Sequence, residues 1–218
     1  MNDRRQQENM ARAAKVAAMR TAQRRQQRRR DSIIIGVLGV FVLGLIGTTF
    51  AVVRAEDQEQ AQQRAQLREA ASRPIEGVQE YPELSQNHVT EPVVYEQFPP
   101  VGGDHASVWM NCGAYTSPVV NEQAVHSLEH GAVWIAYQAD LPADQVQALT
   151  ELAQSNNYTL LSPFDHLDGF SVVASAWGVQ LALDDASDPR LEQFLVKYIQ
   201  GEQTPEPGAP CTGGAGQA

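Results

Sequence analysis

Positive charge is scarce over most of the chain. From Pro74 to the end only Arg190 and Lys197 are basic, whereas residues 1–31 hold ten basic and three acidic residues. The whole chain carries a formal charge of −10, and residues 32–218 hold six basic residues against 23 acidic ones. Such an acidic region repels phosphate backbones, so we expect it to have no nucleic-acid partner. The basic residues 1–31 are typical of a cytoplasmic tail that contacts anionic lipid.

Charge is absent from the 21 residues Ile33–Val53, which Asp31 and Arg54 bracket. At 1.5 Å per residue a helix of this length spans about 30 Å, the thickness of the hydrocarbon core. We predict a single transmembrane signal-anchor over residues 32–54, with the N-terminus in the cytoplasm and the remainder extracytoplasmic, at the cell membrane. A cleaved signal peptide would have a shorter basic region and a shorter apolar run. Four glycines in the run could admit a partner helix from another membrane protein.

Cysteine is also scarce, since Cys112 and Cys211 are the only two in the chain. They do not form a C-x-x-C motif, so redox catalysis has no support. Outside the membrane an even number of thiols favours a disulfide, which would close a long loop and attach the C-terminal region to the domain. A thiolate metal ligand at Cys112 is the alternative.

The region after the predicted anchor divides by composition into three parts. Residues 55–73 are polar and helix-favouring, and they predict a solvated helical stalk that Pro74 ends. Residues 74–200 contain the apolar patterns of a globular domain, and residues 201–218 form a tail rich in glycine and proline.

Apolar periodicity predicts an α+β fold: one compact extracytoplasmic domain with a mostly antiparallel sheet and about three helices. The predicted strands are Pro92–Phe98, Ala132–Tyr137, Tyr158–Ser162 and Phe170–Leu183, the last with a bend or bulge near Gly178. The predicted helices are Asn121–His130, Pro142–Ser155 and Asp188–Gln200.

Five histidines lie between residues 88 and 166. His126 and His130 are four residues apart, so on a helix they project from one face and can chelate one metal ion. His105 follows a loop rich in proline and glycine and could complete the site. Met110 and Cys112 would add sulfur ligands suited to copper. His88 and His166 have no such context, and we expect them at the surface.

The segment His126–His130 also has the spelling H-x-x-E-H of inverzincin proteases, in which Glu129 would activate water. Gly131 ends the predicted helix at once, and Glu151 is the nearest candidate for a third ligand. The alternative to any metal site is that these histidines are buried or capping side chains of the fold.

Three stretches resemble one bacterial family: Phe98–His105 (FPPVGGDH), Trp109 with Asn111–Tyr115 (NCGAY), and Val125–Gly131 (VHSLEHG). The chain is similar over about residues 75–212 to the domain of unknown function 3105. The ending Pro205–Cys211 (PEPGAPC) resembles that of actinobacterial members. The resemblance implies a membrane-anchored extracytoplasmic protein and draws attention to the positions of His105, His126, Glu129 and His130, without implying an activity.

Three functions are compatible with these features. The first is a non-catalytic extracytoplasmic domain that binds copper or zinc through His105, His126 and His130, with Glu129 and Met110 as further candidate ligands. The second is an accessory or scaffold subunit of a membrane complex. The third is a zinc hydrolase, in which Glu129 would be the catalytic residue.

Overall fold

A computed structural model describes residues 58–217 continuously and, before them, residues 15, 19–21, 23–25, 27, 30 and 54, all helical. The chain divides into two compact units, Met1–Gln62 and Gln63–Ala218. The predicted anchor Ile33–Val53 lies outside the described residues. Among the residues that are described, no helix has the length and apolar character needed to cross a membrane. Residues 58–71 are helical, within the stretch expected to form a stalk.

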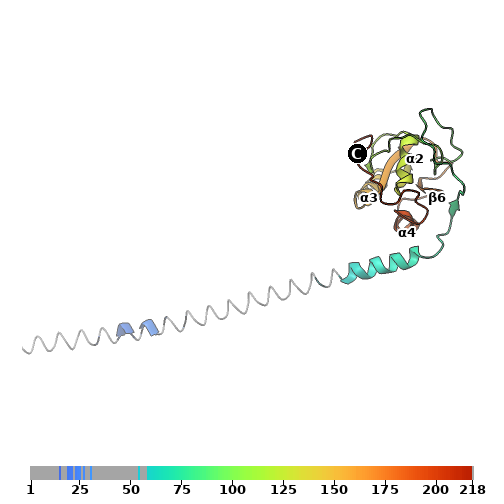
Figure 1. Ribbon diagram of the computed structural model, residues 1–218. Helices are drawn as coiled ribbons and strands as arrows, with labels where there is room; N and C mark the ends of the chain where they lie inside the picture. Colours follow the sequence, from blue (N-terminus) through green and yellow to red (C-terminus); the bar gives the residue numbers. More distant parts are fainter. Residues whose placement is uncertain are drawn as a thin grey trace, which may run out of the picture. The chain divides into compact units, whose positions relative to one another are not determined.

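The second unit, which includes the folded domain in Figure 1, contains a six-stranded sheet. Its strand order is β1-β6-β5-β3-β4-β2. The pairings β1–β6, β6–β5 and β5–β3 are antiparallel, while β3–β4 and β4–β2 are parallel. The α+β class is confirmed. The sheet is mixed: three of its five pairings are antiparallel, and a helical crossover between β3 and β4 makes those two strands run parallel. The strands are β1 (Val78–Glu80), β2 (Gly113–Ala114), β3 (Val133–Gln138), β4 (Thr159–Phe164), β5 (Val172–Ala176) and β6 (Val179–Leu183).

Helices cover both faces of this sheet. Val133, Ile135 and Tyr137 of β3 pack in one apolar cluster with residues of α3 (Ala143–Gln154) and α4 (Pro189–Tyr198). Trp134 and Ala136 belong to a second cluster, with Ala124, Val125 and Leu128 of α2 (Asn121–Glu129). Because successive side chains of a strand point to opposite faces, β3 is buried on both sides, and α2 packs on the face opposite α3 and α4.

Two strand predictions were wrong. Pro92–Phe98 has no strand; the Val93 amide donates to the Glu122 carboxylate at 2.9 Å and not to a neighbouring strand. The predicted strand Phe170–Leu183 is a hairpin, β5 and β6, whose turn contains Gly178 with φ of +70°. Glycine adopts this conformation readily, so the residue marks a reversal of the chain and not a bulge. The predicted strands at β3 and β4 and the helices α2, α3 and α4 are present within a few residues of the expected ends.

The C-terminal residues lack regular structure but are firmly attached. A disulfide joins Cys112 to Cys211 across 99 residues of sequence, as predicted. Beside it the Cys112 amide donates to the Cys211 carbonyl at 2.8 Å, and the Glu206 amide donates to the Glu129 carbonyl at 3.1 Å. These contacts hold residues 206–211 against the C-terminal end of α2.

Candidate metal centre

Helix α2 supplies three polar side chains of the site from its last turns. The Ser127 hydroxyl donates to the Met110 carbonyl at 2.6 Å and so ties the helix to the preceding loop. The helix ends at Glu129 and His130, and Gly131 follows with φ of +89°, the left-handed conformation that commonly closes a helix. His126, Glu129 and His130 are therefore held at a fixed end of a buried helix, with exposed fractions of 4%, 3% and 3%.

The loop that ends at His105 brings a second histidine from a distant part of the sequence. His105 pairs by an isolated parallel bridge with His88: the Val89 amide donates to the His105 carbonyl at 2.7 Å, and the His105 amide donates to the Asn87 carbonyl at 3.0 Å. The His105 side chain is fully buried, whereas that of His88 is 49% exposed. The short bridge thus places both rings over α2.

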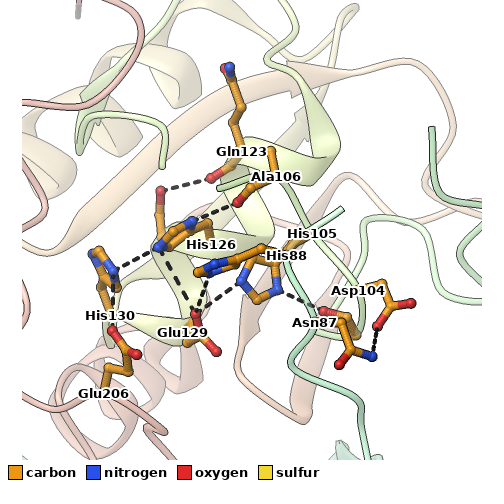
Figure 2. A network of polar contacts seen from close by, with 12 residues as sticks. Asn87, His88, Asp104, His105, Ala106, Gln123, His126, Glu129, His130 and Glu206 are labelled. Atoms are coloured by element: carbon orange, nitrogen blue, oxygen red, sulfur yellow. Dashed lines mark hydrogen bonds and ion pairs between the residues drawn. The ribbon is translucent and has the colours of Figure 1, made fainter. Parts of the chain in front are cut away.

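Four side chains converge at this point (Figure 2). One ligand atom from each of His88, His105, His126 and Glu129 lies within 4.8 Å of the other three. Glu129 Oε2 is 3.0 Å from His105 Nε2, 3.8 Å from His88 Nε2 and 4.0 Å from His126 Nε2. Ligands of a tetrahedral zinc ion, at bond lengths of about 2.0–2.1 Å, are about 3.3 Å apart. The cluster has the donor types and approximate spacing of a site that could hold a metal ion.

Backbone carbonyls fix the tautomer of each buried histidine. His105 Nδ1 lies 2.8 Å from the Gly103 carbonyl, His126 Nδ1 2.7 Å from that of Ala106, and His130 Nδ1 2.7 Å from that of Pro210. A carbonyl only accepts hydrogen bonds, so in each neutral ring Nδ1 carries the proton and Nε2 presents a lone pair. Metal-binding histidines characteristically donate their second nitrogen in this way, which fixes the ring and raises its basicity as a ligand.

The facing atoms of His105 and Glu129 lack hydrogen-bond partners. Although their nearest atoms are 3.0 Å apart, neither His105 Nε2 nor Glu129 Oε2 makes a hydrogen bond, and both are buried. Two acceptors that face each other in the interior cost free energy unless a proton or a metal cation lies between them. This orphaned pair is the strongest indication that the cluster fits a cation.

His126 is suited to act as a neutral ligand. The pKa of His126 is lowered from 6.5 to about 4. Burial is the largest cause and the nearby rings of His130, His105 and His88 add to it, while the hydrogen bond to the Ala106 carbonyl opposes the shift. The ring is therefore unprotonated at neutral pH, and its Nε2 lone pair is available to a cation.

The structure brings together some of the predicted residues and leaves others outside. His105, His126 and Glu129 meet in the four-residue group, and His130 contacts it through His126, whose Nε2 is 2.9 Å from His130 Nε2. Neither sulfur residue belongs to it: Cys112 is in the disulfide, and the Met110 sulfur borders Gly216. His166 is exposed, as predicted.

His88 is the residue that sequence reasoning missed. We expected it at the surface, and although it is half exposed, its ring stacks on that of His126 with centroids 4.9 Å apart. It lies 17 residues before His105, in a segment without periodicity, and only the backbone bridge unites the two. No spacing rule could have found it.

Comparison with known proteins gives one match. A family model described as protein of unknown function (DUF3105) covers residues 88–213, more than half of the chain, and this range includes the four clustered residues and both cysteines. No curated protein and no solved structure matches the chain. The match agrees with the resemblance of the stretches around His105, Cys112 and His126, and the chain belongs to the DUF3105 family.

Proposed function

We propose that this domain binds a divalent metal ion, zinc before copper, through His88, His105, His126 and Glu129. The observation that carries the proposal is the buried pair of acceptors His105 Nε2 and Glu129 Oε2, 3.0 Å apart and without hydrogen bonds. A cation bound by both atoms would remove their repulsion and satisfy both lone pairs. Two oriented and buried imidazoles with one carboxylate would form the rigid part of the site, and half-exposed His88 its side toward solvent.

The donor set favours zinc over copper(I). Imidazole and carboxylate are ligands of zinc and copper(II), whereas copper(I) prefers thiolate and thioether sulfur. The nearby sulfur atoms are directed elsewhere, since Cys112 is oxidised and the Met110 sulfur lies against the C-terminal segment. Bound zinc would stabilise the fold, because its ligands come from three segments that meet only in the folded chain.

A binding role has more support than hydrolysis. Hydrolytic use of the H-x-x-E-H spelling requires a glutamate that contacts a metal-bound water and leaves the metal to other ligands. Glu129 lies instead among three histidine rings, at a distance suited to a ligand. Glu151, the nearest predicted third ligand, is exposed and accepts a hydrogen bond from Gln147.

We further propose that the charge-free run Ile33–Val53 anchors the domain to the outer side of a membrane. The Cys112–Cys211 disulfide supports an oxidising compartment. The acidic surface would raise the local concentration of cations around the site.

Zinc titration of the purified full-length chain in detergent tests the metal proposal. Elemental analysis should find one zinc ion per chain. Excess zinc should raise the melting temperature, because zinc at one hundred times its Kd adds about 2.7 kcal/mol to the free energy of unfolding. His105→Ala should lower zinc affinity about tenfold or more and reduce the stabilisation accordingly, whereas the control His166→Ala, at an exposed histidine, should leave both unchanged. Absence of bound zinc in the wild-type chain, or equal binding by the two variants, would refute the proposal.

A further inference from the structure

The contact between His126 and His130 is not explained by the four-residue site. Their Nε2 atoms are 2.9 Å apart, and both side chains are almost fully buried. Both Nδ1 protons are committed to backbone carbonyls, those of Ala106 and Pro210. The two neutral rings therefore present lone pairs to each other, which is unfavourable unless a proton or a cation lies between them.

Further groups around this contact suit a cation. Glu206 Oε2 is 3.6 Å from His130 Nε2, and its side chain is 57% exposed. The indole of Trp109 lies against both rings, with centroids 4.9 Å from that of His130 and 5.8 Å from that of His126. Figure 2 shows Glu206 beside His130, joined to it by the dashed line of this contact. A cation here would have two buried imidazoles on one side and a solvent-exposed carboxylate on the other.

We propose that His126, His130 and Glu206 form a second, outer position for the same divalent cation, occupied in alternation with the inner site. The reason for the alternation is chemical. His126 Nδ1 is bound to the Ala106 carbonyl, so the ring has one lone pair, on Nε2, and that lone pair can serve only one ion at a time. The inference rests on the proposed function, because it assumes that the inner four residues bind the cation.

Alternation lets an ion move without leaving the protein. An ion at the outer position keeps its bond to His126 Nε2, releases His130 and the Glu206 carboxylate, and gains His105, His88 and the Glu129 carboxylate. The charge of +2 moves with the ion, and in both positions one carboxylate compensates part of it. The exposed Glu206 gives this second position its own access to solvent, separate from the opening at His88.

Zinc affinity of variants tests the outer position, with competition for a chromophoric chelator as the measurement. In the wild-type chain His130→Ala should change zinc affinity by less than about threefold, because the inner site dominates. His88→Ala removes a half-exposed ligand and shifts the ion outward. In that background His130→Ala should lower affinity about tenfold or more, the size expected for loss of one ligand or its close support. Glu206→Gln, an exposed substitution that leaves the fold intact, should act in the same direction.

The control is His166→Ala, which should have no effect in either background. The stoichiometry should stay at one zinc ion per chain, and two ions per wild-type chain would overturn the alternation. Equal effects of His130→Ala in the wild-type and His88→Ala backgrounds would overturn the outer position while the inner site stands. A wild-type chain that binds no zinc would instead refute the proposed function itself.

Discussion

Replacing Glu129 by glutamine distinguishes a cation site from a buried ion pair. In the structure Glu129 Oε2 and His105 Nε2 face each other at 3.0 Å as unsatisfied, buried acceptors. A glutamine amide has the same shape, carries no charge, and can donate a hydrogen bond to His105 Nε2. Each unsatisfied buried group costs about 1–3 kcal/mol. Glu129→Gln should therefore stabilise the chelator-treated protein by about 1–3 kcal/mol.

The opposite result follows if His105 is protonated and forms a salt bridge with Glu129. Removing one partner of a buried ion pair destabilises a protein by about 3–5 kcal/mol. The two explanations thus predict changes in the free energy of unfolding that have opposite signs and differ by at least about 4 kcal/mol. Urea unfolding can resolve this difference, since the extrapolated free energy carries an error of about 10–15%. The measurement is urea unfolding at pH 7 with EDTA, with Glu151→Gln as the control, since that glutamate is exposed.

Zinc should make the wild-type chain more stable than Glu129→Gln, the reverse of the order in EDTA. At one thousand times its Kd the wild-type chain gains about 4.1 kcal/mol, which exceeds the difference of about 1–3 kcal/mol in EDTA, and the variant gains much less because an amide is a poor replacement for a carboxylate ligand. A variant that is less stable than the wild type in EDTA would refute the reasoning, and so would a variant that zinc stabilises as strongly.

Three other substitutions or conditions test parts of the same structure. The pKa of His126 is lowered to about 4 in the folded chain, so on acidification the histidine is protonated in the unfolded state before it is protonated in the folded state. In EDTA the free energy of unfolding should therefore fall by about 3 kcal/mol between pH 6.5 and 4, and the His126→Gln variant should not show this loss. Replacing Cys112 and Cys211 together by serine removes a cross-link between residues 99 positions apart, and it should lower the free energy of unfolding by about 4–5 kcal/mol, measured with a chemical denaturant. A decrease below about 1 kcal/mol would contradict the argument that the disulfide acts by restricting the unfolded chain. Gly131→Ala should cost about 1–3 kcal/mol of thermal stability, because φ is +89° and its Cβ would lie 3.0 Å from the Thr204 methyl, whereas an unchanged melting temperature would show that the turn relaxes.

The features that sequence reasoning predicted depend on local pattern. Helix α2 and its closing Gly131 follow from helix propensity and glycine's conformational freedom, and the spacing of His126 and His130 places both on one face. The disulfide follows from an even number of cysteines in a chain with a predicted anchor.

The features it missed depend on contacts between distant segments. Pro92–Phe98 has apolar residues at strand spacing, yet it forms no strand, and its Val93 amide is satisfied by a side chain of α2 instead. Strands β1 and β2 have three and two residues and exist only by pairing with β6 and β4. His88 reaches the site by the same kind of pairing, through its bridge to His105.

The same long-range contacts connect metal binding to the rest of the fold. The histidine rings are oriented by the carbonyls of Gly103, Ala106 and Pro210, which belong to segments separated by more than 100 residues. The Pro210 carbonyl lies one residue before Cys211, so the disulfide helps to hold the segment that fixes the His130 tautomer. Loss of the disulfide should therefore loosen His130 before His105, whose carbonyl partner is two residues away in its own loop. In the Cys112→Ser/Cys211→Ser variant, provided that it folds, zinc should still bind at the inner site while the effect of His130→Ala in the His88→Ala background disappears.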